Sequence, residues 1–148
     1  MNLMDRQAAL THLISLFGSP YFEGDGEGTD PETGFKCYGF FRYAFRLIGI
    51  GIQDDFALAV LDFFQIFCPP VPWDAAYFRE TSVDRHIGIV IDNGRVLQCS
   101  RETNGVASVR LDVTVERRSF WRHKELTIDG RPVIEAPVAG PRSSLIAL

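Results

Sequence analysis

Two observations predict an α+β fold in which helices come first and an antiparallel sheet follows. Apolar residues recur at the helical spacing i, i+3, i+4 and i+7 in the first part of the chain, and from Ala76 the spacing changes to two. Turn residues separate the later stretches, as in an antiparallel sheet. With 148 residues, 46% of them hydrophobic, the chain suffices for one core and is short for two.

The first predicted helix spans about residues 4–17, carries one apolar face and ends at Gly18. The loop from Ser19 to Phe35 follows, and its glycines and acidic residues do not continue a helix. Its carboxylates raise calcium binding as an alternative, but the ligand order of an EF-hand is missing. We therefore interpret this segment as a solvated loop.

A second helix is predicted to begin near Cys37, after Pro31 and Gly34, and to end at Gly49. Apolar residues occupy two of its faces, so we expect it to be buried nearly all round. These residues are Phe40, Phe41, Tyr43, Ala44, Phe45, Leu47 and Ile48.

A third helix is predicted from the spacing of four apolar residues between Ala57 and Phe64, and the prolines at 69 and 70 end it. The predicted strands are AYFRET, HIGIVID, RVLQCS and VASVRL. Residues 129–148 are rich in Pro, Gly and Ser, so we expect one domain over residues 1–128 and a loosely attached tail.

Charge and cysteine content exclude several classes of function. A formal net charge of -4 with scattered basic residues argues against a nucleic-acid partner. Three cysteines without close paired spacing argue against a disulfide framework and a zinc site. Charges near the N-terminus predict no signal peptide, and polar residues and prolines within residues 56–73 predict no membrane span. We expect a protein made in the cytoplasm.

Cys37 is the candidate nucleophile because it lies in the first turn of the second predicted helix. Unpaired backbone N–H groups and the positive end of the helix dipole favour an anion there, which predicts a lowered pKa for the thiol. Position alone leaves a second interpretation open, in which Cys37 is a small buried hydrophobic residue. Catalysis therefore requires a partner base.

His86 is the candidate base because it starts the predicted strand HIGIVID, where an imidazole can be held rigidly beside the Cys37 helix. His12 lies on a surface face of the first helix, and His123 follows a basic, irregular stretch. We interpret both as incidental. A solvent-facing histidine at the edge of a strand is the alternative for His86.

The register of the hairpin after His86 decides which residue can orient the imidazole. If residues 92–94 form a three-residue loop with Gly94 in the left-handed conformation, Gln98 pairs with Gly88. Gln98 then lies diagonally beside His86, and its carbonyl is expected to accept the Nδ1–H of the ring. A two-residue loop would turn Gln98 to the opposite face. Cys99 lies on the other face, which excludes it as the nucleophile.

These segments resemble those of the NlpC-type cell-wall endopeptidases, a papain-like family. The run GFKCYGFFRYAFRLIGI is similar to the family's nucleophile segment, HIGIVIDNGRVLQCS to its histidine segment, and SPY at residues 19–21 to the tripeptide before its nucleophile loop. The resemblance covers about residues 5–122, with the motifs in the same order and spacing. It implies a papain-like α+β fold with N-terminal helices packed on a small antiparallel sheet. It also implies that Cys37 is the nucleophile, His86 the base, Gln98 the orienting residue and Tyr21 a residue lining the site.

Three positions depart from the family pattern. Lys36 replaces the family's Asp, Tyr38 replaces its Ser, and Gln98 replaces its second His. The Asp and Ser are associated with gripping the free amino end of a stem peptide, so Lys36 and Tyr38 imply a different grip on the substrate. An aromatic residue after the cysteine is similar to the tail-assembly proteins of long-tailed phages.

The resemblance thus implies a phage tail-associated cysteine endopeptidase that cleaves peptidoglycan stem peptides or cross-bridges without a metal or cofactor. Its expected partners are a peptidoglycan peptide and other phage tail proteins, one of which the apolar end of the tail could contact. Its expected location is the host cytoplasm during assembly and then the virion tail. Two alternatives remain open: an inactive structural component of a tail tip, and a thioester-forming acyltransferase or amidase.

Overall fold

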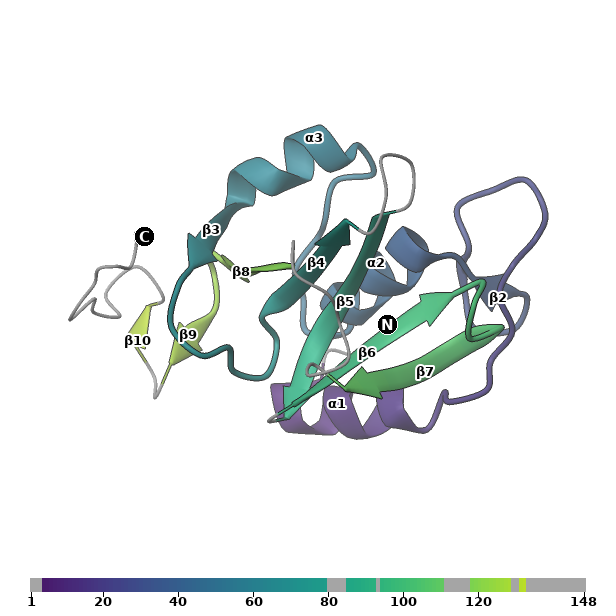
Figure 1. The fold of residues 1–148 in the computed structure, drawn as a ribbon, viewed down its shortest axis with the longest axis horizontal. Helices are drawn as coiled ribbons and strands as arrows, with labels where there is room; N and C mark the ends of the chain where they lie inside the picture. Colours follow the sequence, from purple (N-terminus) through teal and green to yellow (C-terminus); the bar gives the residue numbers. More distant parts are fainter. Residues whose placement is uncertain (1–3, 80–84, 93, 111–117, 129–130, 133–148) are drawn as a thin grey trace.

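A six-stranded antiparallel sheet forms the centre of the computed structural model, which describes residues 4–79, 85–92, 94–110, 118–128 and 131–132. The strand order is β3-β8-β4-β5-β6-β7, and Figure 1 shows β5, β6 and β7 side by side as two successive hairpins. The strands are β3 (Phe63–Ile66), β4 (Ala75–Arg79), β5 (Arg85–Asp92), β6 (Arg95–Ser100), β7 (Gly105–Arg110) and β8 (Ser119–His123). The predicted α+β class and the four predicted strands are confirmed.

Three helices precede most of the sheet: α1 (Arg6–Ile14), α2 (Cys37–Leu47) and α3 (Phe56–Ala59). Side chains cap two of them, since Asp5 accepts the amide of Ala8 at 2.7 Å and Asp55 accepts that of Ala57 at 2.9 Å. The first helix is shorter than the expected span of residues 4–17. The second begins at Cys37 as expected, and Gly49 follows its end in the left-handed conformation, with φ 86°.

The third predicted helix is wrong over most of its length. Only Phe56–Ala59 is α-helical, a 3-10 turn covers Val60–Asp62, and the chain then extends into β3. Phe63–Ile66 instead pairs with Phe120–His123 of β8. This pairing supplies hydrogen-bond partners for the backbone, which a helix would have supplied from within itself. The stretch containing β8 was not predicted as a strand, so the sequence offered no partner for β3.

Two short hairpins lie outside the main sheet. Within the loop that precedes α2, β1 (Thr29–Asp30) pairs with β2 (Gly34–Phe35). Near the end of the described chain, β9 (Thr127–Ile128) pairs with β10 (Arg131–Pro132), so this hairpin spans the expected boundary after residue 128. Residues 133–148, which hold most of the expected tail, lie outside the described residues.

The main core lies between the helices and one face of the sheet. Figure 1 shows α1 and α2 on the same side of the strands, with α2 behind β5. Phe41 and Phe45 of α2 are at most 1% exposed, and Phe45 meets Trp73 edge to face at 5.5 Å between ring centroids. Ala76, Val90 and Val96 form a smaller cluster on the other face. Apolar residues of β5 and β6 are therefore buried on both faces of the sheet, and burial fixes which face each side chain occupies.

No helix within the described part of the chain is long and apolar enough to cross a membrane.

A buried ion pair joins the start of β4 to β8. Asp74 and Arg122 are 0% and 2% exposed, and two hydrogen bonds of 2.6 and 2.8 Å connect the guanidinium with the carboxylate. Asp74 also accepts the amide of Val71 at 2.8 Å. Burial raises the pKa of Asp74 in spite of the adjacent cation. Because the Asp74 carboxylate is removed from water, its charge depends on the paired guanidinium of Arg122 for stabilisation.

We predict that Arg122→Met lowers the free energy of unfolding by about 3–5 kcal/mol, because it leaves the Asp74 carboxylate buried and unpaired. Urea titration followed by circular dichroism measures the change. Lys124→Met is the matched control, since Lys124 pairs with Asp62 at 2.7 Å but is 51% exposed, and we expect little change from it. An equal loss of unfolding free energy in the two variants would show that the buried Asp74–Arg122 pair contributes no more to stability than an exposed pair.

Candidate active site

Cys37 is the first residue of α2, and the loop before the helix packs against its first turn. Lys36 is the N-cap residue, with extended φ -98° and ψ 168°, and its side chain caps no amide of the helix. Gly39 has no side chain because a Cβ there would lie 2.1 Å from the carbonyl oxygen of Gly28. The amide of Lys36 donates to that same carbonyl at 3.0 Å. The loop thus holds the start of α2 while leaving first-turn amides without a side-chain cap.

The sulfur of Cys37 contacts the backbone of β5. The amide of Ile87 donates to Sγ at 3.2 Å, and the thiol faces the carbonyl oxygen of the same residue at 3.5 Å. Cys37 therefore meets the strand at the peptide unit directly after His86. Ile87 and Ile89 belong to the core beneath α2, and strand alternation places the side chain of His86 on the opposite side of β5.

The expected lowering of the Cys37 pKa is wrong for this arrangement. The residue is only partly buried, but protein atoms surround the sulfur, and this desolvation raises the pKa of Cys37 to about 11. The hydrogen bond from Ile87 lowers the pKa by less, and the negative charge of Glu102 adds to the increase. Reasoning from the helix terminus alone omitted the cost of removing a thiolate from water.

The hairpin after His86 has the expected register where it matters for the site. Ile89 pairs with Leu97 and Val90 with Val96, so continuation of the ladder brings Gly88 opposite Gln98. A Cβ on Gly88 would lie 3.2 Å from that of Gln98, which confirms that the two residues share a face. Gly94 is left-handed, with φ 84°, as predicted. The predicted three-residue loop over residues 92–94 is wrong, because Asp92 pairs with Arg95. A register shift between Val90 and Asp92 gives the rest of the ladder the expected register.

Gln98 and His86 lie on one face, but the predicted hydrogen bond between them is not formed. His86 Nδ1 and Gln98 Oε1 are both buried, and neither has a hydrogen-bond partner within the described part of the chain. The imidazole instead directs Nε2 toward Oε1 of Glu102, 3.5 Å away. The free nitrogen of His86 is therefore Nδ1, the atom that was expected to be occupied by Gln98.

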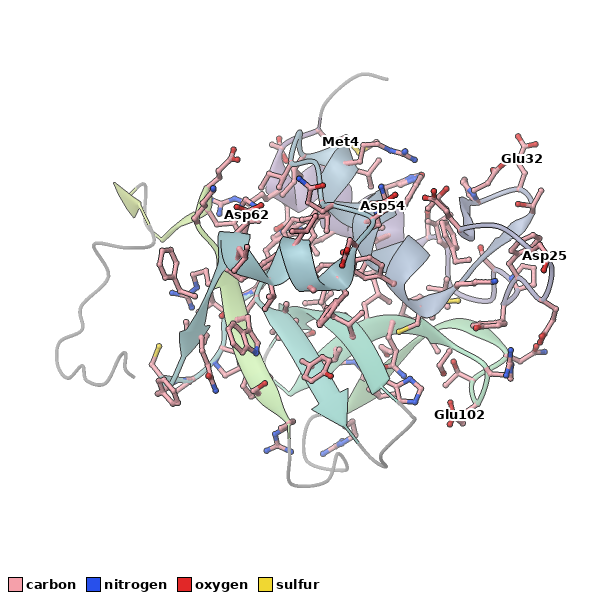
Figure 2. All side chains as sticks on the ribbon, turned by 90° about the horizontal axis from the view of Figure 1, so that it is seen from above. Met4, Asp25, Glu32, Asp54, Asp62 and Glu102 are labelled. Carbon is pink, nitrogen blue, oxygen red and sulfur yellow. The ribbon has the colours of Figure 1, made fainter. Side chains whose placement is uncertain are left out.

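Glu102 is the residue of the site that sequence reasoning missed. It lies in the turn between β6 and β7, and Figure 2 shows it at the rim of the molecule beyond the strands. The register contained a signal for it: continuing the ladder from Val90↔Val96 places Ser100 opposite His86. The turn that follows Ser100 must then lie beside the imidazole, and Glu102 is the acidic residue of that turn.

Two pockets adjoin the first turn of α2, and Tyr38 lines both. One, of about 500 Å³, is lined largely by charged residues: Glu27, Lys36, Arg42, Asp54 and Asp55, with Gly39. The other, of about 140 Å³, is apolar and is lined by Phe41, Phe56, Phe63, Tyr77, Ile87 and Trp121, among others. Of the three predicted substrate-binding residues, Lys36 and Tyr38 each border a cavity, and Ile87, whose amide contacts the sulfur, lines the apolar one.

Tyr21 lies close to this region but faces another partner. A backbone bridge joins it to Phe35, two residues before Cys37, and the guanidinium of Arg101 lies 5.2 Å from the centre of its ring. Tyr21 is therefore held between the segment leading to the nucleophile and the turn that carries Glu102.

The remaining histidines and cysteines make structural contacts. His12 Nε2 lies 3.0 Å from the hydroxyl of Tyr43. His123 is buried within β8, and its Nδ1 accepts the amide of Glu125. Cys99 is fully buried and donates to the carbonyl of Phe35 at 3.2 Å, in agreement with its exclusion as the nucleophile. Cys68 is exposed.

Comparison with known proteins finds similarity among solved structures. No known family profile matches the sequence, and no curated protein sequence matches it. Among solved structures, the NlpC/p60 domain of the peptidoglycan hydrolase SagA aligns with a TM-score of 0.63 and 19% identity, over 80% of this chain and 98% of that domain. The P60 domain of the antigen MAP1204 from M. avium subspecies paratuberculosis aligns with a TM-score of 0.58 and 24% identity, over 83% of this chain and 100% of that one.

NlpC2 from Trichomonas vaginalis aligns with a TM-score of 0.67 and 18% identity, over 83% of this chain and 48% of that protein. The identities are low, so these alignments bear on the fold. The chain has the papain-like α+β fold of NlpC/P60 domains.

Proposed function

We propose that this protein is a cysteine peptidase that hydrolyses amide bonds in the stem peptides or cross-bridges of peptidoglycan. The observation that carries the proposal is the contact of the Cys37 sulfur with β5 at Ile87, directly beside His86, at the start of a helix in an NlpC/P60-type fold. The fold is shared with peptidoglycan hydrolase domains, which supports the choice of substrate.

In the proposed mechanism His86 Nδ1 takes the proton of the Cys37 thiol, and the thiolate attacks the carbonyl carbon of the amide. Backbone amides in the first turn of α2, which Lys36 leaves uncapped, stabilise the oxyanion that forms. His86 then returns the proton to the departing amine, leaving a thioester on Cys37. Water, deprotonated by His86, releases the acid and restores the thiol.

The raised pKa of Cys37 makes the base indispensable. With a pKa of about 11, only about one thiol in ten thousand would be ionised at pH 7 without a partner. Proton transfer to His86 provides the thiolate without exposing the sulfur to water. It requires the imidazole to approach Sγ more closely when substrate binds, and such tightening is common between the free and substrate-bound states of enzymes.

We expect Cys37→Ala and His86→Ala each to lower the rate of peptidoglycan hydrolysis by at least about 1,000-fold, because each removes one half of the proton-transfer pair. The double variant should be hardly slower than either single variant. Digestion of purified cell walls, with the new termini identified by mass spectrometry, measures the rate and identifies the cleaved bond.

Cys68→Ala is the matched control, since it removes an exposed thiol distant in sequence from both partners. Losses that simply multiply in the Cys37/His86 double variant would contradict a shared role. Transfer of the acyl group to an added amine, in place of release of the free acid, would instead identify an acyltransferase.

An inactive structural component with the same fold is the second candidate, and one observation favours it. His86 Nδ1 and Gln98 Oε1 are buried, lack partners among the described residues and belong to side chains on one face of the hairpin, and a hydrogen bond between them would occupy the nitrogen that Cys37 needs. This candidate predicts that wild-type protein and Cys37→Ala both leave cell walls undigested.

We also propose that Lys36 directs recognition away from a free amino end of the substrate. Its cation lines the charged pocket beside Cys37, where it opposes the binding of an ammonium group. The carboxylates of Glu27, Asp54 and Asp55 border the same pocket and act in the opposite direction. Glu27 is already paired with Arg42, and Asp55 accepts the amide of Ala57.

We predict that Lys36→Asp raises the rate on stem peptides with free amino ends relative to amino-blocked peptides, by about tenfold. Lys36→Gln should give an intermediate ratio, because it removes the cation without adding an anion. Arg95→Asp makes the same charge change on an exposed part of β6 and is the control. Liquid chromatography of the two peptide products gives the ratio, and an unchanged ratio in Lys36→Asp would rule out the proposed role.

We further propose that the protein acts as part of a phage tail. The support is the aromatic Tyr38 after the nucleophile, whose ring packs edge to face on Phe56 at 5.7 Å and lines both pockets. Detection of the chain in purified phage particles by mass spectrometry tests this assignment.

A further inference from the structure

We propose that Glu102 is a positioning residue for His86, holding the imidazole through Nε2, the part expected of Gln98. The inference rests on the proposed pairing of His86 with Cys37. It assigns a charged partner from the turn after β6 to a histidine that would otherwise have only a neutral neighbour. An acidic partner changes the chemistry, because a carboxylate stabilises an imidazolium and a neutral amide does so much less.

The distance and the orientation of the ring support the assignment. Nε2 of His86 lies 3.5 Å from Oε1 of Glu102, and the side chain of His86 is only 14% exposed. The side chain of Glu102 is 64% exposed, so its carboxylate keeps much of its hydration while one oxygen reaches the ring. This arrangement leaves Nδ1 as the nitrogen that exchanges a proton with Cys37.

The turn that carries Glu102 is held by its own hydrogen bonds. Ser100 Oγ accepts the amide of Thr103 at 3.2 Å, and the hydroxyl of Thr103 donates to the carbonyl of Gly105 at 2.7 Å. Asn104 is left-handed, with φ 56°, and a Cβ on Gly105 would lie 2.0 Å from the carbonyl oxygen of Ser19. The turn is thus tied both to β6 and to the segment before Tyr21.

The neighbouring charges leave the Glu102 carboxylate available to His86. Arg101 lies next to Glu102 in sequence, but its guanidinium is 3.5 Å from Glu23 and lies over Tyr21. The Glu102 carboxylate thus pairs with His86 and not with its sequence neighbour Arg101.

Glu102 has opposite effects on the two members of the proposed pair. One oxygen of Glu102 is within ion-pair distance of the His86 imidazole, whereas its charge disfavours the thiolate and raises the pKa of Cys37. If Cys37 gives its proton to His86, loss of the carboxylate releases the ring that must accept that proton. Removal of the charge should therefore slow thiolate formation if Cys37 is paired with His86, and speed it if Cys37 titrates alone.

The test measures alkylation of Cys37 by iodoacetamide between pH 5 and 9, resolved from the other cysteines by peptide mass spectrometry. We expect Glu102→Gln to lower the rate at pH 6 by about threefold to tenfold, and Glu102→Asp to lower it less. Glu32→Gln makes the same substitution on the outer part of the loop before α2, apart from Glu102 in Figure 2, and should leave the rate unchanged. An unchanged melting temperature in all variants establishes that the fold is intact.

A rate for Glu102→Gln that equals or exceeds that of wild type at pH 6 would overturn the inference. The experiment needs no substrate, so it separates this inference from the proposed function. Alkylation that responds to Glu102 in a protein unable to digest cell walls would leave the positioning role intact and remove only the choice of substrate. Loss of the response in the His86→Ala background would show that Glu102 acts through the imidazole.

Discussion

The seating of the first turn of α2 on β5 is the constraint on which the site depends. The carbonyl of Gly28 lies where a side chain at position 39 would be, so the loop can press against the helix only because residue 39 is glycine. That contact brings the Cys37 sulfur to the peptide of Ile87, and it places Lys36 and Tyr38 on the walls of the two pockets. The uncapped amides, the candidate nucleophile Cys37 and the strand that carries His86 are therefore positioned together.

Burial and charge act in opposite directions at this site. Packing that holds the sulfur firmly also removes it from water, which raises its pKa and disfavours the nucleophilic form. The proposed transfer of the thiol proton to His86 would offset this cost, and an exposed carboxylate can hold that imidazole without itself being fully desolvated. Placing Glu102 on a surface turn and His86 on a buried strand satisfies both requirements. The buried pair of Asp74 and Arg122 solves the same problem differently, with two full hydrogen bonds.

Local sequence signals predicted the parts of the fold that depend on neighbours along the chain. The start of α2 at Cys37 followed from the glycines and proline before it. The face of Gln98 was predicted correctly, but a register shift between Val90 and Asp92 produces it, and not the expected three-residue loop. The segment at Phe63–Ile66 was misread as helix, because its strand conformation depends on pairing with Phe120–His123, far away in sequence. The strand β8 was not predicted either, because the irregular sequence before it obscures its alternation of apolar and polar residues.

By itself the sequence determined the α+β class and the helix that starts at Cys37, because short-range sterics and periodicity govern these features. Only the tertiary structure decided how the site groups meet. Desolvation of the Cys37 sulfur depends on atoms from β5. The pairing of Glu102 with Nε2, in place of the expected bond from Gln98 to Nδ1, depends on where the turn after β6 places a carboxylate. Both are properties of packing between distant segments, which residue spacing alone does not encode.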